Sequence, residues 1–148
     1  MTKEVLKNKQ EYSFEDLIDI MKILMGPDGC PWDKAQTHQS IRMNAIEEAY
    51  EVVDAIDQND KKKMVEELGD LLLQSIFHCM IAERDSEFTL KEVIDALCKK
   101  LIFRHQHVFG EVKAQNAAEA LSTWNSAKAE EKHLKTVTQD MKELPKYF

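Results

Sequence analysis

The stretch "LLLQSIFHCMI", from Leu71 to Ile81, decides the fold that we expect for this chain. It contains no glycine or proline, so it favours a helix. On a helix its apolar side chains point to almost every side, and such a helix must be covered all round. A single layer of four helices rarely provides that cover. The stretch therefore predicts an all-α fold, a four-to-five-helix bundle assembled as a homo-oligomer in which a second copy covers it.

The rest of the 148 residues favours the same class, because it is poor in glycine and proline and its apolar residues recur at helical spacing. Ser13 with Asp16, and Thr89 with Glu92, are typical of helix N-terminal caps, and Asp60 is a further cap. We expect helices from Ser13 to the "GPDGCP" segment, over about 40–58, from Asp60 to about residue 84, from Thr89 to the "RHQHVFGE" segment, and over 117–132.

Two of these helices carry an apolar stripe that we expect to be buried. The stripe of the second helix is Ala45, Ala49, Val52, Val53 and Ile56, and that of the fourth is Val93, Ile94, Leu97, Leu101 and Ile102. We expect residues 1–12 to be an N-terminal extension, residues 13–132 to form one domain, and residues 133–148 to be a C-terminal tail.

The overall charge and the cysteines narrow the class of partner and the compartment. A net charge of −7 argues against nucleic acid as a partner, because nucleic-acid-binding proteins present a basic face. A phosphorylated small molecule is not excluded, since a bound cation can invert the local field. No apolar run reaches the ~18 residues of a membrane span, and Cys30, Cys79 and Cys98 form no Cys-x-x-Cys pair. We therefore expect no membrane partner and a cytoplasmic protein with reduced thiols.

The second expected helix collects acids without any base. Glu48 and Glu51 are three residues apart, and Glu47 and Glu51 are four apart, so their side chains share one surface. Like charges at these spacings destabilise a helix by ~0.2–0.5 kcal/mol per pair. Residues 43–60 contain six acids and no lysine or arginine. We therefore expect an external cation to neutralise them.

The third expected helix also carries a pair of acids on one face, because Glu67 and Asp70 are again three residues apart. Gly69 between them costs ~1 kcal/mol of helix propensity relative to alanine, which suggests that a ligand or another backbone comes close. Two antiparallel helices joined by a short turn would bring the two acid pairs face to face. Carboxylate oxygens suit a hard cation, so we expect Mg²⁺, with Mn²⁺ as the second candidate.

The same residues allow two alternatives to a magnesium site. Each acid pair alone is typical of a solvated helix face, and Lys63 could pair with Glu67 four residues on. Two matched pairs on adjacent helices favour the metal site instead. A di-iron carboxylate bundle needs a Glu-x-x-His motif on each of two helices, and only Glu130 with His133, in a polar segment, fits it.

These acids stand in a set of recognisable segments. They spell EExxE at Glu47, Glu48 and Glu51 and ExxD at Glu67 and Asp70, among "GCPWDKAQTH", "EELGDLLLQ", "RHQHVFG" and "WNSAKAEEK". From about residue 14 to 132 the chain resembles the MazG family of nucleoside triphosphate pyrophosphohydrolases. The resemblance implies the all-α NTP pyrophosphatase fold as a homodimer or dimer of dimers. It also implies Mg²⁺-dependent hydrolysis of a nucleoside triphosphate to the monophosphate and pyrophosphate, which would cleanse the nucleotide pool.

The resemblance also implies roles for individual residues. Glu48, Glu51, Glu67 and Asp70 would be the metal ligands. Glu47 would be an assisting catalytic carboxylate, which either orients the attacking water or supports the ligands from outside. A related pyrophosphohydrolase of narrower substrate, for a deoxynucleoside triphosphate or phosphoribosyl-ATP, is the first alternative. A catalytically weak protein that senses nucleotides is the second.

Substrate contacts are implied for residues outside the acid motif, and each has a structural alternative. Lys100 and Arg104 would contact phosphates, or complement the dipole at the end of their helix. Trp124 with Lys128 would close over the nucleotide, or Trp124 would be a core aromatic residue. Three further candidates are Trp32, which either stacks on a base or plugs the end of the bundle, Lys34 in the same loop, and Asn44, which could read a base edge.

Two segments depart from the family pattern beside the expected pocket. Gln106 stands where the family more often has proline, in "RHQHVF". The segment "RMNA", residues 42–45, replaces a step that usually contains proline and tyrosine. Because both lie outside the acid motif, they bear on substrate preference more than on the chemistry.

Overall fold

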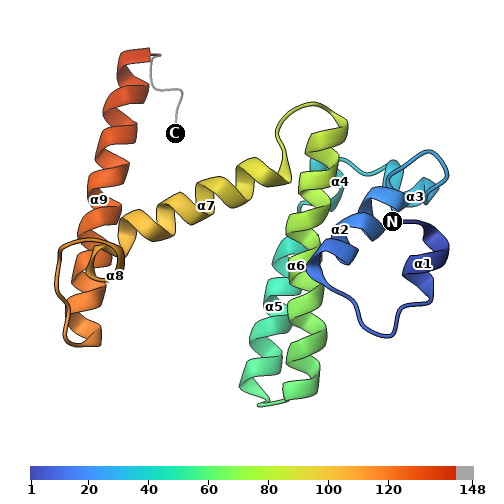
Figure 1. The fold of residues 1–148 in the computed structure, drawn as a ribbon, viewed down its shortest axis with the longest axis horizontal. Helices are drawn as coiled ribbons and strands as arrows, with labels where there is room; N and C mark the ends of the chain where they lie inside the picture. Colours follow the sequence, from blue (N-terminus) through green and yellow to red (C-terminus); the bar gives the residue numbers. More distant parts are fainter. Residues whose placement is uncertain (143–148) are drawn as a thin grey trace. The chain divides into compact units, whose positions relative to one another are not determined.

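The computed structural model describes the backbone of residues 1–142 and the side chains of residues 1–133. Every secondary-structure element in this part of the chain is a helix, which confirms the all-α prediction (Figure 1). None of these helices is both long enough and apolar enough to cross a membrane. The helices are α1 (Lys3–Lys7), α2 (Phe14–Leu24), α3 (Pro31–Lys34), α4 (His38–Ile41), α5 (Asn44–Asp57), α6 (Lys61–Arg84), α7 (Leu90–Arg104), α8 (Gln106–Phe109) and α9 (Ala117–Lys142).

The chain forms two compact units, Met1–Val93 and Ile94–Phe148. The first unit holds α1 to α6 and the start of α7, and the second holds the rest of α7 with α8 and α9. The predicted caps are present in the first unit. Ser13 and Asp16 form a capping box on α2, and the Asp60 carboxylate accepts from the backbone of Lys63 at 3.0 Å. Local sequence therefore sets where these helices begin.

Helices α5 and α6 form an antiparallel hairpin in the first unit, as the sequence predicts (Figure 1). Only residues 58–60 separate them, and Asn59 makes the turn with a positive φ of 52°. Asparagine tolerates this left-handed conformation better than most residues. The hairpin places the first half of α6 against α5, so side chains from the two helices meet along one seam.

The second half of α6 is the core of the first unit. Its buried residues pack with Met21 of α2 and Ile41 of α4, and partly buried side chains of α2 surround them. The prediction that a second copy covers all of Leu71–Ile81 is therefore wrong for the second half of α6, because α2 and α4 of the same chain cover it. The α6 residues of this core cluster are Ile76, Phe77, Cys79, Met80 and Ile81, and Gln74 and Ala82 of α6 are buried as well.

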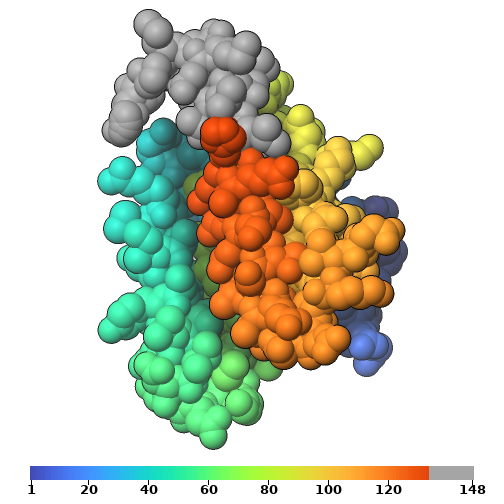
Figure 2. All heavy atoms as spheres, turned by 90° about the vertical axis from the view of Figure 1, so that its left-hand side faces the viewer, coloured from blue at the N-terminus to red at the C-terminus, as the bar shows by residue number. Residues whose placement is uncertain are grey.

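The predicted apolar stripes are only partly buried. On α5 the buried residues are Val52 and Ala55, whereas Val53 and Ile56 are each 53% exposed. Positions 48, 52 and 55 form the face of α5 toward α6. The predicted stripe is therefore rotated around the helix relative to the face that is buried. Figure 2 shows α5 (cyan to green) exposed along its length. All five stripe residues of α7 are exposed as well, namely Val93, Ile94, Leu97, Leu101 and Ile102.

The sequence pattern missed the shortest helices, because one turn of helix carries no periodic signal. Residues 1–12, expected as an extension, contain α1, whose Leu6 is only 4% exposed and which packs on α2. The expected loop after "GPDGCP" contains α3 and α4, and α8 follows α7. The last expected helix continues beyond residue 132, since α9 runs to Lys142.

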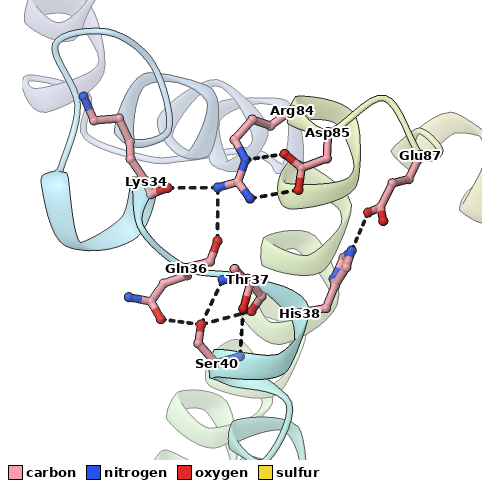
Figure 3. Close-up of polar contacts among 8 residues, drawn as sticks. All are labelled: Lys34, Gln36, Thr37, His38, Ser40, Arg84, Asp85 and Glu87. Carbon is pink, nitrogen blue, oxygen red and sulfur yellow. Dashed lines mark hydrogen bonds and ion pairs between the residues drawn. The ribbon is translucent and has the colours of Figure 1, made fainter.

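Arg84, the last residue of α6, fastens the segment between α3 and α4 (Figure 3). Its guanidinium Nη1 donates to the backbone carbonyls of Lys34 at 2.9 Å and Gln36 at 3.1 Å. His38, which begins α4, contacts the Glu87 carboxylate through Nε2 at 2.7 Å. These contacts hold this segment at the C-terminal end of α6, while the acids of the ExxD motif lie in its first half.

Candidate metal centre

Three of the predicted ligands converge at the seam between α5 and α6. Glu48 of α5 and Glu67 and Asp70 of α6 each offer a carboxylate oxygen, and these oxygens lie within 4.8 Å of one another. The i, i+3 spacing of Glu67 and Asp70 places both on one face of α6. The antiparallel hairpin then brings Glu48 of the other helix to that face. The sequence pattern alone predicts this juxtaposition.

Electrostatics makes this cluster unfavourable when no cation is bound. Burial raises the pKa of Glu48 above its ordinary value, and the negative charges of Asp70, Glu51 and Glu47 raise it further. Burial also raises the pKa of Glu67, followed by the charges of Glu51 and Asp70. Each shift means that the folded protein resists placing another negative charge there. A bound cation would reverse that resistance.

The fourth predicted ligand, Glu51, lies outside this group of three. Its Oε2 is 3.9 Å from Nζ of Lys63, which also contacts Oδ2 of Asp54 at 2.9 Å. Among the described residues, Lys63 forms its ion pairs with α5 and not with Glu67 of its own helix. The expectation that no base offsets the acids of α5 is therefore wrong at its second half, where Lys63 lowers the pKa of Asp54 through a hydrogen bond. The remaining candidate, Glu47, is exposed on α5.

Gln74 is a residue of this region that sequence reasoning missed. It is 8% exposed, and its Oε1 has no hydrogen-bond partner among the described residues. It lies one helical turn after Asp70. The available signal was a single amide within the apolar run "LLLQSIF". The carboxylates of Glu48, Glu67 and Asp70 form an all-oxygen donor set, which fits a hard divalent cation such as Mg²⁺ or Mn²⁺.

Gly69, by contrast, offers no support for a close approach within the chain. A Cβ added to it would meet nothing within 4 Å. The expectation that another backbone or a ligand comes close at this position therefore finds no counterpart in the single described chain. The glycine lies on the exposed side of α6, between Glu67 and Asp70 in sequence.

Three predicted substrate contacts lie in the first unit. Asn44 is the first residue of α5, one turn before Glu48, and is half-buried. Trp32 of α3 makes an edge-to-face contact with Phe77 at a centroid distance of 6.5 Å, yet it remains 60% exposed. Nζ of Lys34 donates to the backbone carbonyl of Pro27 at 3.1 Å. Trp32 thus touches the core with its edge and keeps a free surface.

The other four predicted contacts lie in the second unit, and three of them meet there. The Arg104 guanidinium carbon is 5.3 Å from the centre of the Trp124 ring, and Nζ of Lys128 is 4.9 Å from it. Nε of Arg104 also donates to Glu131 at 3.1 Å, and Arg104 is only 9% exposed. Lys100, one turn earlier on α7, is half-buried. Two cationic side chains therefore contact the Trp124 ring, and the ring quadrupole attracts each of them.

Comparison with known proteins identifies relatives of this chain. Residues 36–109 match the family model described as the MazG nucleotide pyrophosphohydrolase domain. The nucleoside triphosphate pyrophosphohydrolase/pyrophosphatase MazG of Thermotoga maritima is 46% identical over 80% of this chain and 45% of its own length. The nucleoside triphosphate pyrophosphohydrolase of Escherichia coli K12 is 39% identical over 88% of this chain and 50% of its own length.

The fold has a counterpart among solved structures. The crystal structure of a mazG-related protein from Thermotoga maritima matches with a TM-score of 0.66 and 27% identity. The match covers 78% of this chain and 98% of that protein. The chain spans only about half the length of the two curated relatives named above. Their likeness therefore concerns one region of those longer proteins.

Proposed function

This chain belongs to the MazG nucleotide pyrophosphohydrolase domain family, and from that premise we propose that it hydrolyses a nucleoside triphosphate to the monophosphate and pyrophosphate with Mg²⁺ or Mn²⁺. One observation carries the proposal, namely the meeting of Glu48, Glu67 and Asp70 within 4.8 Å. The names of the relatives, which describe nucleoside triphosphate pyrophosphohydrolases, support it.

The carboxylates explain how such a reaction is prepared. A divalent cation supplies charge neutralisation for the triphosphate and activates water at neutral pH. Glu48, Glu67 and Asp70 would hold that cation from the two helices of the hairpin, and Glu51 would supply a further carboxylate from α5. Glu47, one residue before Glu48, assists from the exposed side of α5. The raised pKa values of Glu48 and Glu67 support this role, because crowded carboxylates gain most from a cation.

The polyanionic substrate also needs positive and aromatic groups. We assign the phosphate contacts to Lys100 and Arg104, and the closing element to Trp124 and Lys128. Asn44, Lys34 and Trp32 are the candidates for contacts to the nucleoside. The cation pair around Trp124 supports an anion-binding role for the second unit.

A homodimer or dimer of dimers belongs to the same proposal. The hairpin exposes large apolar side chains along both helices, which monomeric proteins rarely gather in one region. A second copy of the chain would cover them. Light scattering of the purified protein should give a mass of at least two chains, and a monomer would contradict this part of the proposal. The exposed side chains are Ile46, Tyr50, Val53 and Ile56 of α5 and Val65, Leu68 and Leu72 of α6.

A turnover assay tests the enzymatic proposal. Purified protein is incubated with each nucleoside triphosphate and deoxynucleoside triphosphate, with Mg²⁺ or with a chelator, and released pyrophosphate is measured. We expect release with the cation and none with the chelator. No pyrophosphate from any of these substrates would overturn the proposal. A panel of modified nucleotides then tests the proposed use in cleansing the nucleotide pool, which requires that they react faster than the common nucleotides.

A further inference from the structure

We propose that Gln74 is an additional residue of the cation centre, whose amide oxygen accepts a hydrogen bond from the hydrated cation. This inference rests on the proposed cation site of Glu48, Glu67 and Asp70. It begins from Oε1 of Gln74, which is buried and has no partner among the described residues. Folded proteins pair nearly all of their buried polar groups, so such an atom requires an explanation.

The position of Gln74 on α6 directs it toward the acids. An α-helix turns about 100° per residue, so a residue seven positions after Glu67 lies about 20° from it around the axis. The same arithmetic places Gln74 about 40° from Asp70, on the side of Glu67, and about 6 Å further along the helix. Side chains on a helix lean toward its N-terminus. The long Gln74 side chain therefore leans toward the turn that carries Asp70.

No described residue donates a hydrogen bond to the amide oxygen of Gln74. Of the side chains that follow on α6, Ile76 and Phe77 belong to the apolar core and carry no donor. Ser75 and His78 carry donors, but neither bonds to this oxygen. The carboxylates of Glu67 and Asp70, when ionised, accept hydrogen bonds but do not donate them. The described residues therefore leave this oxygen without a donor. A divalent cation that keeps part of its water shell provides O–H donors at this place.

In the cation-free protein an amide is tolerated better at this position than another acid would be. It supplies an oxygen lone pair without adding a fourth negative charge to carboxylates whose pKa values are already raised. Groups that contact a metal's surroundings rather than the metal itself commonly change its affinity by about 10–100-fold when removed. We assign Gln74 this supporting role in holding the cation.

The test measures cation affinity in the full chain, without substrate. Gln74→Met keeps the length of the side chain and removes the acceptor. Titration calorimetry with Mn²⁺ alone should show binding about tenfold or more weaker than in the wild type. Gln39→Met, a change at an exposed glutamine of α4, is the matched control and should leave the affinity unchanged.

Thermal unfolding separates this role from a purely structural one. Without cation, Gln74→Met should melt at the wild-type temperature or above it, since it removes an unpaired buried polar group. Its gain in Tm on adding Mn²⁺ should be smaller than that of the wild type. Should Gln74→Met fail to fold, Gln74→Glu decides the matter. It retains the oxygen, so the proposal requires it to bind Mn²⁺ at least as tightly as the wild type does.

The outcomes distinguish this inference from the function on which it rests. If the wild type binds Mn²⁺ and Gln74→Met binds it equally well, the role of Gln74 is overturned while the cation centre stands. Weaker binding by Gln74→Glu than by the wild type likewise overturns it. If the wild type itself binds no Mn²⁺, the cation centre falls and the inference falls with it.

Discussion

Carboxyl groups lie in opposite electrostatic environments at the two ends of the α5–α6 seam. Near the turn of the hairpin, Asp54 meets Nζ of Lys63 at 2.9 Å, and this contact lowers the pKa of the carboxyl group. About two turns away, Glu48 meets Glu67 and Asp70, and its pKa is raised by burial and by the charges of Asp70, Glu51 and Glu47. One end carries its own cation, and the other presents acids alone.

The difference teaches how a cation site can be told from an ordinary acidic surface. At Asp54 the chain itself supplies the neutralising charge. The acid therefore contributes to folding, and its negative charge is not available to attract a cation. At Glu48 and Glu67 the fold tolerates crowded carboxylates that oppose it. Such a cost is typical of functional sites, where structure is arranged for a bound state rather than for the free protein.

The largest expected effect comes from removing charge at the acid cluster. Glu48→Gln and Asp70→Asn each keep the shape of the side chain but weaken the hold on a cation. We expect pyrophosphate release to fall at least about 100-fold in each variant, in line with the loss of a major electrostatic contribution. Circular dichroism should show an unchanged helix content. The control is Asp57→Asn, a change at an exposed acid of α5, the helix that also carries Glu48. Full activity of Asp70→Asn would refute the assignment of Asp70 as a cation ligand.

The next effect concerns stability with and without cation. Saturating Mn²⁺ at about 100 times its dissociation constant should stabilise the wild type by about 2.7 kcal/mol. Glu67→Gln should raise the Tm of the cation-free protein, because it removes repulsion, and should abolish most of the gain from Mn²⁺. Asp54→Asn should do the reverse, with a lower Tm and an intact response. If the two variants change the Tm and the response to Mn²⁺ in the same way in a melting experiment, the two ends of the seam do not differ as described.

A smaller effect is expected at Gly69, between two of the acids. Since a Cβ there meets nothing within 4 Å, Gly69→Ala should stabilise α6 by about 1 kcal/mol. For a chain of this size that corresponds to a rise in Tm of roughly 2–4 °C. The measurement is a thermal melt together with the mass in solution. A lower Tm or a smaller assembly would show that a second chain approaches α6 at this point.

The smallest effects should appear as opposite slopes with pH in the cation-free protein. The raised pKa values of Glu48 and Glu67 mean that stability is lost as the pH rises through them, above about pH 4.3. The lowered pKa of Asp54 means that stability is lost as the pH falls below about pH 3.9. Glu48→Gln should flatten the upper slope of Tm against pH, and Asp54→Asn the lower one. A wild-type Tm that rises steadily from pH 5 to 8 would contradict the upper slope.

Short-range patterns in the sequence determined the helix caps, the shared face of the acids and the α5–α6 hairpin. The capping pairs Ser13–Asp16 and Thr89–Glu92 form as predicted. The spacing of Glu67 and Asp70 put both on one face, and the short turn after α5 implied an antiparallel hairpin. These features depend on residues within a few positions of one another, so the periodicity of a helix is enough to predict them.

Only the tertiary structure decided which groups meet across helices. Lys63 pairs with Asp54 of α5, not with Glu67 four residues away on its own helix. The covering of α6 by Met21 and Ile41 likewise depends on how α2 and α4 fold back over it. The burial of Gln74 is likewise a property of the folded chain. The physical reason is that contacts between helices depend on their rotation and register, which residue spacing within one helix does not specify.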